Sequence, residues 1–225
     1  MTQATQAGTA LPFYSSEHWQ RQALLCQWLA TLMSKELDDA SLAAYRAGEA
    51  APLLDWLRED GLTEEAGALQ AAITGLGLFE HPRLELAADF ATLFLSDARH
   101  GAAPYASCYV TERGGFMAGP ARRMADRLAD AGVTLPADFR EPADHLAVML
   151  DYLAGGYRQL AELDAPAQAR VLAGLAQFLE KELCNWLSAF SQRCRQQATA
   201  SPFYPALAQL VTAFCRQRLL EAGTH

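Results

Sequence analysis

A carboxylate and an imidazole stand next to each other in the stretch EPADHLAVML, Glu141 to Leu150. Asp144 and His145 could exchange a proton, or hydrogen-bond a cationic ligand. Pro142 predicts that a helix begins there, since proline's missing N–H would go unpaired at a first helical position anyway. Asp144 then falls in the first turn, where negative charge is favourable. Two interpretations stay open: a capped helix start with a polar histidine, or a ligand site in which a free helix N-terminus, the carboxylate and the imidazole converge.

Hydroxyl groups are concentrated in a second stretch, APYASCY. Tyr105, Ser107 and Tyr109 alternate as they would in an extended segment. Tyrosines in loops either anchor the loop to the core or face a ligand. We regard both roles as open for Tyr105 and Tyr109.

A third stretch, RLELAADFATLFL, places Glu85 and Asp89 four residues apart on a predicted helix. Paired carboxylates can perform acid–base chemistry or bind metal. Pairs at this spacing more commonly form a solvated stripe or pair with an arginine such as Arg83. The apolar residues of the stretch have helical spacing and are expected in the core; they are Leu84, Phe90, Leu93 and Phe94.

Enzyme motifs are missing from the sequence. There is no Gly-x-Gly-x-x-Gly after a strand, no Walker loop, no His-Glu-x-x-His and no Gly-x-Ser-x-Gly. The five histidines are widely spread. We therefore expect no catalytic residue, no metal site and no cofactor. A metal-dependent or acid–base hydrolase that uses Asp89, Asp144 and His145 remains the alternative.

Composition limits the class of protein further. The 225 residues carry a net charge of −8, which disfavours binding to a phosphate backbone, so no nucleic-acid partner is expected. The five cysteines include no Cys-x-x-Cys pair, which favours reduced thiols over a disulfide frame. Neither a signal peptide nor a membrane span is expected. These features predict a cytoplasmic protein.

The elements that must position these stretches are helices throughout. Apolar residues recur every three and four positions, and prolines precede several of the periodic segments. The sequence predicts an all-α bundle of about nine to ten helices, near residues 17–35, 39–47, 52–59, 63–77, 82–95, 120–131, 142–162, 166–195 and 205–222.

The aperiodic segments suggest how the bundle is divided. We predict an N-terminal helical part at 1–112, a hinge segment with one short helix at 113–141, and a C-terminal helical part at 142–225. A long irregular connection inside a compact chain is unusual. Such a hinge would allow a monomer, or a homodimer that exchanges halves between chains.

Taken in order, the three stretches resemble the TorD family of molybdoenzyme-specific chaperones. The family pattern has an acidic–aromatic helix, matched here at Asp89-Phe90, followed by a Pro-Tyr-x-Ser-x-Tyr loop, matched from Pro104 to Tyr109. Its most specific element, Glu-Pro-x-Asp-His-Leu, is matched without departure at 141–146. The sequence of these motifs most resembles the branch of the family that serves trimethylamine N-oxide reductase.

The resemblance implies a binding protein without turnover of its own. Its partner would be apo trimethylamine N-oxide reductase together with the twin-arginine leader peptide of that enzyme. The chaperone would assist insertion of the molybdopterin guanine dinucleotide cofactor and delay export. By carry-over, Asp144 and His145 contribute to the peptide site, Glu141 and Pro142 belong to the same motif, and Tyr105 and Tyr109 are further candidates.

Weak binding of guanine nucleotide is associated with the family, although no phosphate loop supports it here. A regulatory adaptor that binds a folded partner helix is the other alternative.

Overall fold

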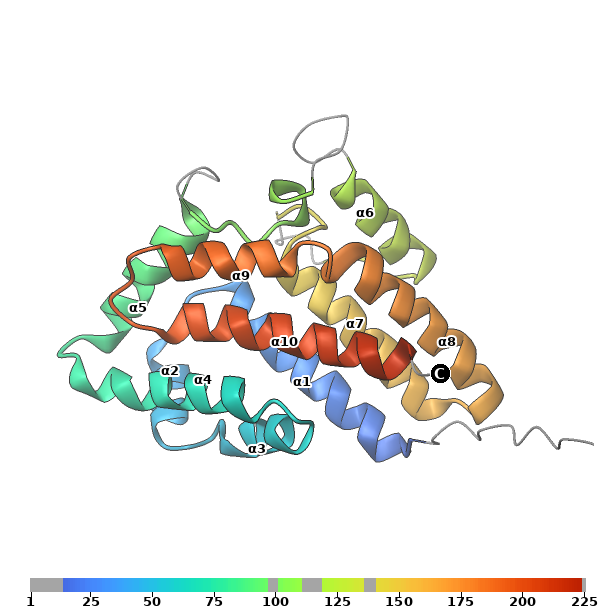
Figure 1. Ribbon diagram of the computed structural model, residues 1–225, viewed down its shortest axis with the longest axis horizontal. Helices are drawn as coiled ribbons and strands as arrows, with labels where there is room; N and C mark the ends of the chain where they lie inside the picture. The colour runs from blue at the N-terminus through green and yellow to red at the C-terminus, as the bar shows by residue number, and fades with distance from the viewer. Residues whose placement is uncertain (1–13, 97–100, 111–118, 136–140, 224–225) are drawn as a thin grey trace, which may run out of the picture.

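The computed structural model describes residues 14–96, 101–110, 119–135 and 141–223. Within these ranges the regular elements are helices, and the only strand-like pairing is an isolated bridge between Tyr105 and His145. The all-α prediction is confirmed (Figure 1). The α-helices are α1 (Ser16–Ser34), α2 (Asp39–Arg46), α3 (Ala51–Glu59), α4 (Thr63–Gly75), α5 (Pro82–Phe90), α6 (Pro120–Asp130), α7 (Leu146–Glu162), α8 (Ala165–Phe178), α9 (Leu187–Gln196) and α10 (Phe203–Gly223).

Four shorter elements extend or connect the α-helices. The 3-10 turn η1 (Leu76–Leu78) ends α4, and η3 (Ala106–Cys108) lies in the loop before α6. The π-helical turns η2 (Ala91–Leu95) and η4 (Leu179–Leu183) continue α5 and α8.

The packing of α1 along α7 forms the centre of the fold. Trp19, early in α1, stacks on Tyr157, late in α7, with ring centroids 5.9 Å apart, so the two helices run antiparallel. Leu25 and Leu29 are fully buried in α1, as its apolar spacing predicts. Leu24 is 49% exposed, because it lies one residue, about 100°, around the helix from Leu25.

Helices from both sides of the predicted hinge share one hydrophobic core. α1 packs on α7, and α4 packs on α10. Figure 1 shows α9 and α10 crossing in front of α1 and α7. The short helix expected inside 113–141 is α6, while residues 113–118 and 136–140 lie outside the described residues. The boundaries at 112 and 142 stay a prediction.

Helix starts follow the local chemistry of the sequence. The side chains of Ser15, Asp38 and Asp164 each accept a backbone N–H three residues ahead, the usual N-cap arrangement. Pro82 and Pro120 are the first residues of α5 and α6, which needs no N–H.

The prediction of one continuous helix over 166–195 is wrong. The chain widens into η4, where the N–H of Cys184 donates to the carbonyl of Leu179 at 2.7 Å, and then turns before α9. The indole N–H of Trp186 donates to the carbonyl of Glu182 at 2.7 Å. That bond gives a partner to a carbonyl that has no helical N–H donor at the break. The apolar spacing continues through the break, so it did not indicate that the helix ends.

Candidate functional site

Two loop segments pair at the start of α7. The N–H of Ala106 donates to the carbonyl of Asp144 at 3.2 Å, and the N–H of Leu146 donates to the carbonyl of Pro104 at 2.8 Å. We call residues 104–109 and 141–147 together the junction. It contains all six predicted site residues, and a bridge joins Tyr105 to His145 at its centre. The other four are Glu141, Pro142, Asp144 and Tyr109.

The start of α7 differs from the prediction. The helix begins at Leu146, so Pro142 and Asp144 precede it. His145 is the N-cap, and its Nδ1 accepts the N–H of Ala147 at 3.1 Å. The pairing with 104–106 holds the chain out of helical geometry up to His145, and this tertiary effect overrides the proline signal.

The carboxylate of Asp144 is fully buried. Its Oδ2 accepts the backbone N–H of Ser107 at 2.8 Å, which fixes the loop containing η3 to the start of α7. Its Oδ1 has no hydrogen-bond partner among the described residues. The Oδ2 contact holds the loop against α7, and in this conformation Asp144 does not face solvent.

The imidazole of His145 is also buried, and it lies edge-on to the ring of Tyr105, with centroids 5.0 Å apart. Burial lowers the pKa of His145 to about 4, although the nearby carboxylates of Glu141 and Asp144 act in the opposite direction. The side chain is therefore neutral near pH 7, which suits its role as an acceptor in the N-cap.

Tyr105 and Glu141 form the outer side of the junction. The hydroxyl of Tyr105 donates to Oε2 of Glu141, and Glu141 is exposed. Burial, with that hydrogen bond to the carboxylate, raises the pKa of Tyr105 well above its usual value. Of the predicted site residues, Glu141 presents its charge most directly to a partner.

Tyr109 anchors its loop to the C-terminal helices. Its ring stacks on Trp186 at 5.4 Å between centroids, and the guanidinium of Arg193 lies over it at 5.0 Å. The extended alternation expected for 105–109 is wrong after Tyr105, because Ala106–Cys108 form the 3-10 turn η3. The core-anchor interpretation describes Tyr109.

Asp89 is a structural residue rather than part of a solvated stripe. It is 4% exposed, and its two oxygens accept the backbone N–H groups of Ala200 and Ser201, each at 2.8 Å. Arg83 pairs with Asp39 at 3.3 Å and not with Glu85 or Asp89. Both oxygens of Asp89 are thus engaged in holding the loop before α10.

The neighbours of Asp89 on the same stretch divide between core and surface. The core prediction is confirmed for Phe90, Leu93 and Phe94, whereas Leu84 is 55% exposed. Leu84 lies in the first turn of α5, at the edge of the bundle. In the described part of the chain no three His, Cys, Asp or Glu side chains are grouped so that they could hold a metal ion.

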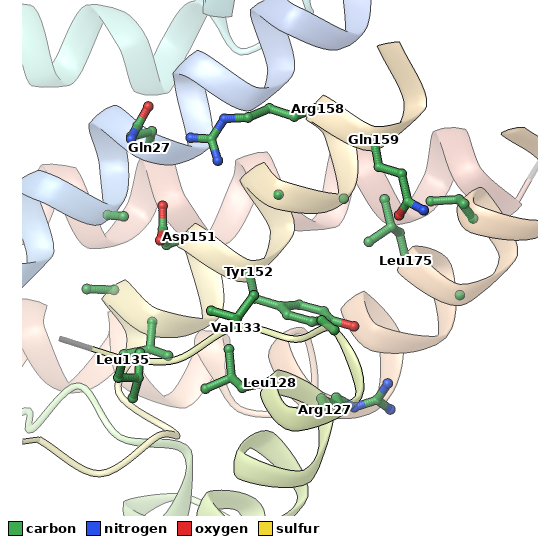
Figure 2. A pocket seen from close by; sticks show the side chains of 18 of the residues that line it. Gln27, Arg127, Leu128, Val133, Leu135, Asp151, Tyr152, Arg158, Gln159 and Leu175 are labelled. Atoms are coloured by element: carbon green, nitrogen blue, oxygen red, sulfur yellow. The ribbon is translucent and has the colours of Figure 1, made fainter. Parts of the chain in front are cut away.

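Beside the junction lies a groove that the sequence analysis missed. It has a volume of about 760 Å³ and is lined by residues of α1, α6, α7 and α8 and of the segment after α6 (Figure 2). Leu128, Val133 and Leu135 contribute apolar side chains from the α6 side, and Tyr152 lies between them and Arg158 in Figure 2. The sequence signal that could have indicated it is the Gly155-Gly156 pair inside a predicted helix, where glycine is unfavourable.

Comparison with known proteins assigns the family. The family model described as nitrate reductase delta subunit matches residues 58–192. Proteins named chaperone protein TorD from Vibrio parahaemolyticus, Vibrio cholerae O1 El Tor and Vibrio vulnificus YJ016 are 35%, 36% and 37% identical. These alignments cover 88%, 88% and 87% of this chain and 92%, 90% and 92% of the relatives.

The relatives are named chaperones, and this chain is a chaperone rather than an enzyme. It belongs to the TorD family of molybdoenzyme chaperones, as the three sequence stretches predicted. A search of the described helices finds none that is long and apolar enough to cross a membrane.

Proposed function

We propose that this protein is a cytoplasmic chaperone for trimethylamine N-oxide reductase. It binds the apoprotein and its twin-arginine leader peptide, supports insertion of the molybdopterin guanine dinucleotide cofactor, and delays export until the enzyme is loaded. The observation that carries the proposal is the 35–37% identity, over about nine-tenths of each chain, to proteins named TorD.

The chemistry of the surface supports this partner. A twin-arginine leader is basic at one end and apolar beyond it, and the chain carries a net charge of −8. Glu141 is exposed at the junction, and a partly apolar groove begins at the next helix. Complementary charge favours encounter and orientation, while apolar burial provides affinity.

Titration of the purified chain with a synthetic leader of the reductase tests the proposal. We expect saturable binding that weakens with added salt, because the arginines meet carboxylates. The same leader with both arginines replaced by glutamines is the control and should bind more weakly. Equal affinity for the two peptides, or no binding to either the leader or the apo-reductase, would contradict the proposal.

The junction residues enter this proposal through positioning. Asp144→Ala with His145→Ala should weaken leader binding at least about tenfold, or about 1.4 kcal/mol. Asp144→Asn with His145→Asn is the matched control, because the amides can still accept the N–H groups of Ser107 and Ala147. If both double variants bind the leader as tightly as the parent chain does, the junction has no part in recognition.

The adaptor alternative is distinguished by the same titration. An adaptor that recognises only a folded partner helix would bind the mature reductase without its leader and would ignore the free leader. Guanine nucleotide belongs to the proposal only if adding it changes the leader affinity.

A further inference from the structure

We propose that the groove between α1, α6, α7 and α8 holds the apolar core of the leader as a helix lying parallel to α7, with its arginines toward Asp151 and its other end toward Arg158. This inference rests on the proposed function, and it adds the location, conformation and direction of the bound segment.

The length of the groove indicates the conformation of its occupant. Its lining along α7 includes a row of residues spaced four apart, namely Ala147, Asp151, Gly155 and Gln159. Twelve helical residues span about 18 Å. The apolar core of a secretory signal is about 7–15 residues long. An extended chain would place only about five residues in 18 Å, whereas a helix places about twelve.

Bare backbone on two helices gives an incoming helix room to approach. Gly155 on α7 and Gly174 on α8 both line the groove, and a Cβ added to either would meet no atom within 4 Å. Packing therefore does not require glycine at these two positions. The two glycines leave bare backbone on the groove wall, and a ligand helix can approach bare backbone more closely than it can approach a side chain.

Gly156 differs from its neighbour Gly155. A Cβ on Gly156 would lie 2.5 Å from Cδ2 of Leu175, so that glycine allows α8 to pack against α7. The groove floor thus combines one glycine that the fold requires with two that it does not.

Two opposite charges set the direction of the bound helix. Asp151 and Arg158 are exposed, line the groove, and form no ion pair with another described residue. They are seven residues apart on α7, or about 10 Å. A carboxylate stabilises the N-terminal end of a helix and a guanidinium stabilises the C-terminal end. The arginines precede the apolar core in a leader, so both effects favour the same orientation.

The dipoles of the neighbouring helices do not oppose this direction. α1 runs antiparallel to α7, so the helix dipoles along the groove floor largely oppose each other and leave the side chains to decide. Glu141, exposed just before α7, adds a second carboxylate near the Ala147 end. The junction therefore lies on the side where the arginines are placed.

The first test fills the groove with a side chain. Gly155→Leu in the full chain should weaken binding of the reductase leader at least about tenfold. Gly67→Leu is the matched control: Gly67 is also helical with open space around it, but it lies in α4 outside the groove. The titration is repeated with a designed peptide of two arginines followed by about twelve leucine and alanine residues.

The second test reverses a charge. Asp151→Arg should weaken binding of the leader. A leader with two glutamates in place of the arginines should bind that variant more tightly than the unchanged leader does. Asp126→Arg, at an exposed position of α6 that does not line the groove, makes the same change in net charge and should not reverse the preference between the two leaders.

A photo-crosslinker beside the arginines should label the Ser34 and Ala147 end, and one after the apolar core should label the Gln159 end.

The outcomes separate the two proposals. If the parent chain binds the leader but Gly155→Leu and Gly67→Leu bind it equally well, the groove is not the site and the proposed function stands. Crosslinks in the reverse order overturn the direction. If the parent chain does not bind the leader, but binds the designed peptide more tightly than Gly155→Leu does, then the groove is a peptide site and the proposed function fails. Binding of neither peptide overturns both.

Discussion

His145 accepts the N–H of Ala147 while its ring packs against Tyr105. Both contacts suit a neutral imidazole, because a protonated ring has no acceptor atom. The adjacent Asp144 accepts the N–H of Ser107. The two residues that most suggested chemistry therefore hold the loop against α7, and in the proposed function they act by setting the shape and position of the junction.

Stability should fall as His145 is forced to protonate. Its pKa is about 4 in the folded chain against an ordinary 6.5, so between these values the unfolded chain binds a proton that the folded chain does not. The free energy of unfolding then decreases as the pH drops from about 6.5 toward 4. Urea denaturation at pH 7, 6 and 5 measures this decrease.

His145→Asn is the control for that experiment. Asparagine caps a helix as well as any residue and does not titrate, so the variant should lose less stability than the parent chain over the same pH interval. His18, whose pKa burial also lowers, stays in both chains and contributes equally. Identical pH dependence in the two chains would show that His145 does not titrate as described.

At the scale of the elements, Asp89 fastens α5 to the loop before α10. Asp89→Ala removes the acceptor for the N–H groups of Ala200 and Ser201, and each hydrogen bond to a charged group contributes about 1.5–3 kcal/mol. We expect a loss of about 3 kcal/mol in the free energy of unfolding. Hydrogen exchange at residues 200 and 201 should accelerate.

Glu85→Ala is the matched control, since Glu85 lies one turn earlier on α5 and is only partly buried. It should change the free energy of unfolding by no more than about 0.5 kcal/mol. A loss as large as that of Asp89→Ala would mean that the effect comes from the helix surface rather than from the loop contact.

The adjacent glycines of α7 should respond in opposite directions. Gly155→Ala enters open space and should raise the free energy of unfolding by up to about 1 kcal/mol, the helix preference of alanine. Gly156→Ala meets Leu175 and should lower it by about 1–3 kcal/mol, the usual cost of overpacking. Thermal denaturation of both variants decides, and a gain in both would show that Leu175 moves aside without cost.

Most helices could be predicted because their signals are local. The bounds of α2 and α3 agree with the expected 39–47 and 52–59 to within one residue, and α8 begins at the local N-cap Asp164. The break between α8 and α9 could not be predicted. Glu182, in the π-helical turn at the break, is buried and pairs with Arg123 at 3.0 Å and Arg127 at 3.5 Å, two residues that are distant in sequence.

The site was predicted in part for the same reason. The motif EPADHL identified the residues that meet at the junction, but their burial depends on pairing with 104–107, which periodicity does not report. The groove was missed because four separate helices line it and its chain signal is only a pair of glycines.

At the scale of the whole molecule, the two predicted halves do not have separate cores. α1 buries Leu25, Leu29 and Leu32 in the core that it shares with α7, and all three are at most 1% exposed. Exposing three leucines would cost roughly 4–9 kcal/mol, which is comparable to the whole stability of a typical domain. Each half should therefore depend on the other, whether both come from one chain or from two.

Fragments 1–112 and 113–225, purified separately, should each lack a cooperative unfolding transition, and mixing them should restore it together with binding of the leader. The physical reason is that α1 and α7, and also α4 and α10, complete each other's buried faces across the division. The same contacts made between two copies would give the exchanged dimer that the hinge allows. Circular dichroism melts of each fragment and of the mixture measure this, with the intact chain as reference. A cooperative melt from fragment 1–112 alone would instead establish an independent N-terminal domain, and an exchanged dimer would then need no shared core to form.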